Sequence, residues 1–295
     1  MCIRDRPTGA QERPWYLGVD VGIGQAEGLS QSASGVRTPT RCDPWLYAGT
    51  GFQAPSNAGC LPEEGRWWWS DLTPGIGFPG ALRVGRAFDR FRVEAEVLHR
   101  HHGGDRTVVS AGGQDIARPG KDSQWNPLAP PSAGIADFRA TQAFLNAYWD
   151  FPNRSRATPF AGVGVGWAWT GFNFSSHWIR KTVAQGYLDI RYATDWPEAA
   201  KRAAAGTVSL MDETISGRQF GWQVPAGVDY GMTDRVSLTG TVRWARFADL
   251  QKEVTFVINR SHEPVQADGS TPYARLLKFK GLGYWAATIG LRYRF

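Results

Sequence analysis

Apolar and polar residues alternate along eight segments of this chain, and this period of two restricts the fold more than any other feature of the sequence. The sharpest example is segment 91–100, FRVEAEVLHR, in which apolar residues occupy every second position opposite charged ones. Successive side chains of a strand point to opposite faces, whereas a helix would spread these charges around its surface. The alternation therefore predicts β-strands.

The two faces of these segments differ in a consistent way. One face carries valine, leucine, isoleucine and tryptophan, and the other carries glycine, polar and charged residues. Apolar residues outside and small or polar residues inside are typical of a membrane β-barrel, whereas a soluble lipocalin-like carrier would hold its large aromatic residues inside. The predicted strands are 15–24, 77–88, 91–100, 139–151, 159–170, 220–230, 236–247 and 283–295.

The lengths of the connections support a barrel independently. The links after the second, fourth and sixth strands are short, and the other four, 25–76, 101–138, 171–219 and 248–282, are long. Short turns at one end and long loops at the other are typical of outer-membrane barrels. We therefore expect an all-β fold, an eight-stranded antiparallel up-and-down transmembrane β-barrel with four long outer loops.

Two of the long segments are expected to hold structure of their own. Residues 194–206 predict a short helix, because Pro197 and Glu198 precede a run of alanines that ends at Gly206. Val254, Phe256 and Ile258 alternate, so the seventh strand should continue and pair with residues near 276–280.

Composition excludes two other classes of protein. The 295 residues have a mean hydropathy of −0.36 and contain no run of about 18 apolar residues, so a membrane-spanning helix is excluded. A closed barrel is the other structure that satisfies every backbone group within a bilayer. The net charge of +6 is spread along the chain without a dense basic run, so no nucleic-acid partner is expected.

The first residues differ in character from the rest. MCIRDR at residues 1–6 has neither the apolar core nor the cleavage site of a signal peptide, and it resembles a translated sequencing-adapter remnant. We expect 1–14 to be a non-native or disordered segment and 15–295 to be the barrel domain. We also expect a bacterial outer-membrane location, with the signal peptide missing from this chain.

The strands resemble the opacity-type and OmpA-like family of eight-stranded outer-membrane barrels. The resemblance covers about half of the chain, leaves out the long loops, and lies in 15–24, 80–96 (GALRVGRAFDRFRVEAE), 146–166 (NAYWDFPNRSRATPFAGVGVG), 226–242 and 290–295 (GLRYRF). It implies that Leu291, Tyr293 and Phe295, which share one face, form the C-terminal signal read by the outer-membrane assembly machinery. An ordinary last strand is the alternative.

Charged residues of both signs are expected on the inner face. An eight-stranded barrel is just wide enough for side chains, and unpaired buried charge is costly, so mixed signs predict a paired polar plug in the lumen. An ion-conducting pore, or a catalytic pair of Glu94 and Glu96, is the alternative. The predicted lumen network is Asp20, Arg83, Glu94, Glu96, Asp229, Arg243, Arg292 and Arg294.

Three smaller groups suggest further sites. Cys42 and Cys60 share one Gly/Pro-rich segment and are expected to form a loop disulfide in an oxidising compartment, with Cys2 apart. Histidines at the end of the third strand could bind a metal, but polar surface residues are the favoured interpretation. Tryptophans before the second strand are expected in the upper aromatic belt rather than in a ligand platform. These residues are His99, His101, His102, Trp67, Trp68 and Trp69.

Enzyme function would require a nucleophile, a base and an orienting group within reach of one another. Ser175, Ser176 and His177 form the one compact candidate, without a motif of the lipid-modifying barrel enzymes. We therefore expect no catalytic, metal or cofactor site. The predicted function is that of an integral surface protein whose plugged barrel displays long loops for recognition, adhesion or envelope integrity. Its expected partners are outer-membrane lipid, the assembly machinery and ligands on host or neighbouring cells. A lipid-modifying enzyme and a small-solute pore remain the alternatives.

Overall fold

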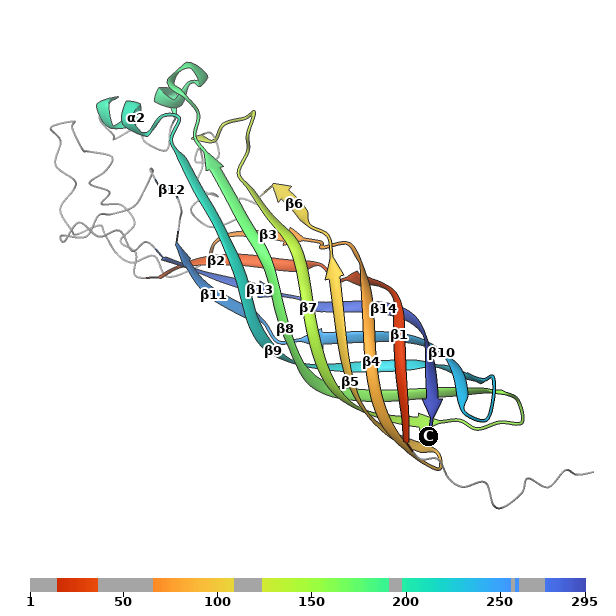
Figure 1. Cartoon of the computed structure of the whole chain (residues 1–295). Coiled ribbons are helices and arrows are strands. Elements are labelled where there is room, and N and C mark those ends of the chain that lie inside the picture. Colours follow the sequence, from red (N-terminus) through yellow and green to blue (C-terminus); the bar gives the residue numbers. More distant parts are fainter. Residues whose placement is uncertain (1–14, 37–65, 109–123, 191–197, 256–257, 260–273) are drawn as a thin grey trace, which may run out of the picture.

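The computed structural model describes residues 15–36, 66–108, 124–190, 198–255, 258–259 and 274–295. Eight long antiparallel strands form a closed barrel, because β10 pairs with both β14 and β9 and so joins the two ends of the sheet (Figure 1). The wall runs in the order β10, β14, β1, β4, β5, β7, β8, β9. The strands are β1 (Trp15–Ala26), β4 (Ile76–Phe88), β5 (Phe91–His102), β7 (Ser132–Asp150), β8 (Ala157–Ile179), β9 (Val208–Gly231), β10 (Val236–Phe247) and β14 (Gly283–Arg294).

Each of the eight predicted segments coincides with one barrel strand, so the predicted fold class is confirmed. The predicted range 236–247 has the bounds of β10, whereas β8 and β9 extend far beyond their predicted ranges of 159–170 and 220–230. Residues in the barrel alternate between exposed and buried, as in β5, where Phe91 is exposed and Arg92 is buried. The period of two in the sequence is therefore the alternation between the outside and the lumen.

The exposed face of the wall is an apolar band bounded by aromatic residues. Val163, Val165, Leu238, Val242 and Ile289 are between 36% and 62% exposed, so the structure confirms that they point outward. Exposed aromatics at the short-turn end are Trp15, Phe88, Phe91, Trp149, Phe151, Tyr230, Tyr293 and Phe295. Exposed aromatics at the opposite end are Phe78, Trp167, Trp169, Phe220, Trp222 and Trp285. Together with the half-buried Trp244, they are called the outer girdle below.

An apolar band between two aromatic girdles matches the hydrocarbon layer and its two interfaces. Aromatic side chains of the outer girdle also contact one another. Trp222 and Trp244 meet edge to face at 4.8 Å, and Trp244 stacks on Trp285 at 5.9 Å between ring centroids. The exterior is thus built to face lipid.

Beyond the outer girdle, the wall continues as further strands. β2 (Leu29–Val36), β3 (Arg66–Leu72), β11 (Leu250–Thr255) and β13 (Ala274–Lys280) form a second sheet in the order β11, β13, β2, β3. This order repeats that of β10, β14, β1 and β4, from which the four strands continue after short breaks. The second sheet is called the outer sheet below.

The breaks require backbone that glycine allows. Gly281 separates β13 from β14 with φ of +79°, and a Cβ there would lie 2.5 Å from the carbonyl oxygen of Gly28. Gly75, before β4, has φ of +76°. Only glycine adopts such angles without steric cost, so these residues let the chain change direction between the two sheets.

The described parts of the four long segments contain more strand than the sequence analysis expected, because the outer sheet and the extensions of β8 and β9 lie in them. β11 pairs with β13, Glu253 opposite Leu276, which confirms the predicted continuation beyond the seventh strand. β6 (Asp105–Val108) pairs with β7, and β12 (Ile258–Asn259) pairs with β9.

Helical turns lie at the far end of β8 and β9. They are η3 (Val183–Gln185), η4 (Tyr187–Asp189) and α2 (Glu198–Ala204), the last within the predicted range 194–206 (Figure 1). In the part of the chain that the structure covers, no helix is long and apolar enough to cross a membrane.

Candidate functional site

The first group in the lumen is built around Arg83 of β4. Its Nη2 donates to Oδ1 of Asp20 at 2.7 Å, and its Nη1 lies 3.7 Å from Oε2 of Glu94. Glu94 also accepts hydrogen bonds from the hydroxyls of Tyr16 and Tyr148, at 3.0 and 3.1 Å. Both oxygens of the Glu94 carboxylate therefore accept from tyrosines, one on β1 and one on β7.

Gly85 makes room for this group. A Cβ at Gly85 would lie 2.2 Å from the ring of Tyr16, which is 1% exposed. Glycine on the inner face thus lets a large side chain cross a narrow lumen.

The second group pairs Glu96 of β5 with Arg243 of β10 across the barrel. Arg243 Nη1 lies 2.5 Å from Glu96 Oε1, and Gln223 Nε2 donates to the same oxygen at 3.2 Å. Gln223 Nε2 also lies 2.8 Å from Oδ1 of Asn146. The side chains of Arg243 and Glu96 are 2% and 0% exposed, so neither has water as an alternative partner.

The third group lies nearest the short-turn end and centres on Asp229. Its Oδ2 lies 2.8 Å from Nη1 of Arg292 and 3.3 Å from Nη1 of Arg92, and its Oδ1 accepts from Thr239 at 2.7 Å. Arg92 also lies 2.9 Å from Asp150. Every carboxylate named in these three groups has an arginine partner.

The structure thus places seven of the eight predicted lumen residues inside the barrel. Arg294, the eighth, is half-buried at the end of β14, and no ion pair of the described residues includes it. Arg92, which was not on the predicted list, takes part in the network instead. Its position opposite Phe91 in the alternating pattern was the signal that could have identified it.

Above these groups lies an arginine of a different kind. Arg100 of β5 is 1% exposed, and no ion pair of the described residues includes it. Its guanidinium lies 4.3 Å from the ring centroid of Tyr284 and 5.1 Å from that of Phe138, and Nη1 donates to Nε2 of His102 at 2.9 Å. Aromatic faces and an imidazole therefore replace a carboxylate as its partners.

The upper part of the interior contains a large cluster of apolar side chains, which corrects the expectation of a lumen filled by polar groups alone. Phe172 stacks on Phe138 at 5.6 Å and meets Phe279 edge to face at 4.9 Å. Phe279 also contacts Phe174 at 5.5 Å. The barrel strands and the outer sheet enclose this core together, and it also includes Leu29, Leu72, Ile135, Met211, Ile215, Phe247, Leu250, Val254, Leu277 and Leu282.

The structure also places the residues of the alternative catalytic and metal sites. Glu94 and Glu96 face the lumen, but each is held by arginine and neutral donors in a buried position. His99 and His101 face outward and His102 faces inward, so the three histidines do not converge. Among the described residues, no group of three potential metal ligands occurs.

Ser176 is separated from Ser175 and His177 by the wall of the barrel. Ser176 is buried and accepts a hydrogen bond from Nε1 of Trp178 at 2.7 Å, whereas Ser175 and His177 lie on the other face of β8. Burial and the nearby Arg106 lower the pKa of His177. Ser175 Oγ accepts from Arg106 at 3.0 Å. The inward Ser176 is thus held by Trp178, and the outward Ser175 is engaged by Arg106.

Two predicted features fall partly or wholly outside the described residues. Cys42 and Cys60 lie in residues 37–65, and their disulfide remains a prediction. Trp67, Trp68 and Trp69 lie in β3 of the outer sheet, but their side chains are not described. Leu291, Tyr293 and Phe295 are 49%, 45% and 54% exposed on the outer face, and their role as an assembly signal also remains a prediction.

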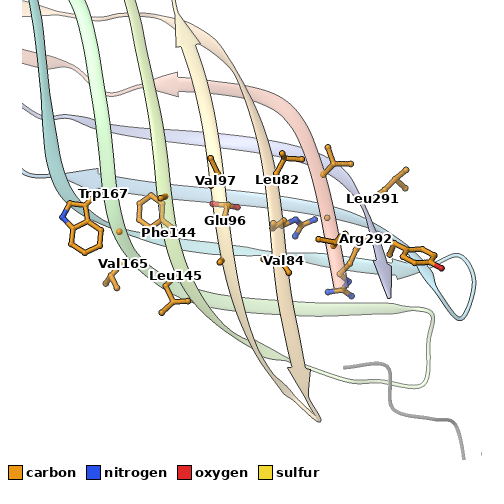
Figure 2. A pocket seen from close by; sticks show the side chains of 18 of the residues that line it. Leu82, Val84, Glu96, Val97, Phe144, Leu145, Val165, Trp167, Leu291 and Arg292 are labelled. Carbon is orange, nitrogen blue, oxygen red and sulfur yellow. The ribbon is translucent and has the colours of Figure 1, made fainter. Parts of the chain in front are cut away.

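A hollow of the described part lies on the outer wall rather than in the lumen. It has a volume of about 1060 Å³ and extends over β14, β1, β4, β5, β7 and β8 and to Val236 of β10, with small side chains at Ala95 and Ala143 among larger ones. Figure 2 shows Leu82, Val84, Val97, Leu145 and Val165 lining it from the outer side, whereas Glu96 lies across the wall. The hollow is therefore part of the surface that faces lipid.

Comparisons with known proteins find structural likeness only. No family model and no curated protein matches the sequence. Solved structures that resemble it include the outer-membrane protease OmpT from Escherichia coli, at 11% identity over 96% of this chain and 97% of that chain, with a TM-score of 0.44. The outer-membrane protein OprG from Pseudomonas aeruginosa matches at 13% identity over 96% of both chains, with a TM-score of 0.44. A major outer-membrane protein from Thermus thermophilus matches at 12% identity over 91% of this chain and 100% of that chain, with a TM-score of 0.41.

At these identities and TM-scores the neighbours assign no function. The class of the protein follows from its own geometry, namely a closed barrel, an apolar outer band and two aromatic girdles. The chain is a transmembrane β-barrel.

Proposed function

We propose that this chain is an integral outer-membrane protein of a bacterium, whose sealed barrel holds the outer sheet and α2 at the cell surface for recognition, adhesion or envelope integrity. The observation that carries the proposal is the continuation of the barrel wall beyond the lipid band as a second, packed layer of strands. A chain that needed only an anchor would not require this layer. The binding surface is therefore expected on the outer sheet, on α2 and on the segments that join them.

Two further features favour display over transport. The three ion-pair groups fill the lower lumen, and the aromatic core that includes Phe138, Phe172 and Phe279 fills the upper part. A water-filled passage would need a wider barrel or an unfilled interior. A solute pore is therefore not the function that the geometry supports best.

Catalysis has less support than display. The carboxylates of Glu94 and Glu96 are engaged and buried, and Ser176 faces away from His177. We also propose that the chain is a member of the opacity-type and OmpA-like family and that Leu291, Tyr293 and Phe295 form its assembly signal. Ligands on host or neighbouring cells are the proposed partners of the outer sheet.

The orientation in the membrane can be tested by labelling single cysteines on intact cells. We expect Arg202→Cys on α2, in a chain whose own cysteines are replaced by serine, to react with a maleimide that cannot cross membranes. The side chain of Arg202 is 56% exposed, at the end of the molecule that should face outward. The matched control is Asn153→Cys in the turn between β7 and β8, where Asn153 is also exposed.

Asn153→Cys should react only after the outer membrane is opened, because the short turns should face the periplasm. Labelling of Asn153→Cys but not Arg202→Cys on intact cells would reverse the orientation. Equal labelling of both on intact cells would contradict insertion across the outer membrane.

A further inference from the structure

Arginine occurs in each of the three short turns and at the end of the last strand. The exposed ones are Arg90 between β4 and β5, Arg154 and Arg156 between β7 and β8, and Arg235 between β9 and β10. Arg294, at the end of β14, is half-buried. These five residues are called the basic rim below. The turns that carry them lie at the end of the barrel opposite α2, beside the C-terminus (Figure 1).

Backbone hydrogen bonds hold three of these arginines at regular positions around the rim. The carbonyl oxygens of Arg90, Arg156 and Arg235 each accept from the end of the next strand along the wall. The donors are the backbone N–H groups of Asp150, Gly231 and Arg294, at 2.8, 2.9 and 2.8 Å respectively. Neighbouring turns are two strands apart, which is about 10 Å. The backbone therefore spaces these charges around the whole mouth of the barrel.

The basic rim has an excess of positive charge among the described residues. The exposed carboxylates of the short turns there are those of Asp89 and Asp234. Asp150, at the end of β7, is paired with Arg92 of the lumen. No ion pair of the described residues includes an arginine of the basic rim. The guanidinium groups are therefore available to an anion from outside the chain.

The tips of the turns offer little apolar surface between these charges. Their sequences are PNRSR at 152–156 and TDR at 233–235. Apart from Met232, the exposed large hydrophobic residues beside the turns are aromatics of the girdle that faces lipid. Protein interfaces are instead centred on packed aromatic or apolar anchors. Separated cations at fixed spacing suit a polymer with several anionic groups, because each further contact forms at a high effective concentration.

We infer that the basic rim is a docking surface for peptidoglycan, the glycan–peptide network of the periplasm that carries free carboxylates. Guanidinium suits carboxylate, because two parallel N–H donors match its two oxygens. Peptidoglycan presents many carboxylates on one network, so several arginines of the rim can be engaged at once.

This inference rests on the proposed function for one point, which is that the short turns face the periplasm. It does not depend on what the outer sheet recognises. Binding at the basic rim would connect the outer membrane to the cell wall through the barrel itself, and this gives the role in envelope integrity a specific partner.

Co-sedimentation with purified peptidoglycan sacculi can measure this binding, with the full-length chain folded in phosphatidylcholine nanodiscs. The test variant combines Arg90→Gln, Arg154→Gln, Arg156→Gln and Arg235→Gln. An exposed ion pair contributes a factor of roughly 2 to 3, so the variant should bind sacculi roughly 30-fold more weakly than wild type.

The matched control removes four exposed arginines from the opposite end of the barrel. It combines Arg106→Gln, Arg139→Gln, Arg218→Gln and Arg246→Gln. Its net charge equals that of the test variant, and its affinity for sacculi should be unchanged.

Two changes of conditions test the chemistry with the wild-type chain. Sacculi whose carboxylates have been converted to amides should no longer bind, because the counter-charge of the arginines is gone. Nanodiscs that contain phosphatidylglycerol should still bind unmodified sacculi, because the arginines at the turn tips point away from the bilayer.

The inference is overturned if the test variant sediments as wild type does, if the matched control loses as much affinity, or if amidated sacculi bind equally. It is also overturned if phosphatidylglycerol abolishes binding, since lipid headgroups would then occupy the rim. Binding to polyglutamate beads but not to sacculi would indicate an acidic protein instead. All variants should first give a β-sheet circular dichroism spectrum in nanodiscs. Reversed cysteine labelling on intact cells would contradict the proposed function even if sacculi bind in vitro, so the two failures are distinguishable.

Discussion

Glu96→Ala should lower the free energy of unfolding by about 3 to 5 kcal/mol, because it leaves the guanidinium of Arg243 buried without its counter-charge. The Arg243 side chain is 2% exposed, and its other neighbours are neutral groups such as Oε1 of Gln223, which lies 3.5 Å away. An amide oxygen does not offset a buried charge as a carboxylate does. Urea titration of the barrel folded in lipid vesicles measures the change.

Two control variants separate the effect of leaving a buried charge unpaired from the effect of losing any ion pair. Glu198→Ala removes a pair with Arg202 on α2 whose side chains are 66% and 56% exposed, and such a pair is worth about 0.5 kcal/mol. Glu96→Leu with Arg243→Leu removes both buried charges and should recover most of the stability lost in Glu96→Ala. If Glu96→Ala costs no more than Glu198→Ala, the lumen is hydrated and the barrel is not sealed at this level.

Arginine on the outer face should have the second-largest effect. Ile289→Arg and Leu238→Arg should each cost about 2 to 4 kcal/mol, because the side chains lie between the two girdles and a charge there meets hydrocarbon. Ile289 is 55% exposed and Leu238 is 36% exposed, so neither substitution disturbs a packed protein core. Folding titrations into vesicles of a single phospholipid measure the difference.

Thr241→Ser is the control on the inner face. Thr241 is 5% exposed and lies opposite Thr288 in β14, so loss of one methyl group there removes no charge and adds none. Equal folding of Ile289→Arg and Thr241→Ser would mean that Ile289 does not face lipid.

The lipid-embedded part of the fold could be predicted because the large apolar residues of each strand stay on its outer face throughout. On β8, the outward positions Val163, Val165 and Trp167 are all large and apolar, and the residues between them are the glycines Gly164 and Gly166. Constant alternation of this kind fixes both the strand and its register.

The strands beyond the outer girdle could not be predicted in the same way, because the outer face of a single strand passes from lipid to water along its length. Beyond Trp169 of β8, the large apolar residues are Phe172 and Phe174, which point inward, while Asn173 and Ser175 point outward to water. The apolar positions thus shift from odd to even numbers within three residues. In the sequence this shift interrupts the alternation and resembles the end of a strand.

The lumen network was predictable in its composition but not in its contacts. Alternation places Arg83, Glu94, Glu96 and Arg243 on the inner face, but their pairing depends on how far each strand is displaced along the barrel. Arg294 shows the limit of alternation, since it shares the inner face yet lies at the rim, where no carboxylate of the described residues reaches it.

The most direct test of the central claim, that the apolar outer face contacts lipid, is to measure the collision rates of a nitroxide with oxygen and with a water-soluble nickel chelate. Nitroxides at Leu238 and Ile289 should collide often with oxygen and rarely with nickel, because oxygen concentrates in hydrocarbon and the chelate stays in water. Nitroxides at the adjacent inward residues Thr239 and Thr288 should collide rarely with both. A label at Arg202 should show the nickel collisions of open water. If nickel relaxes the label at Ile289 as strongly as the label at Arg202, the outer face is in water and the account of a transmembrane barrel is wrong.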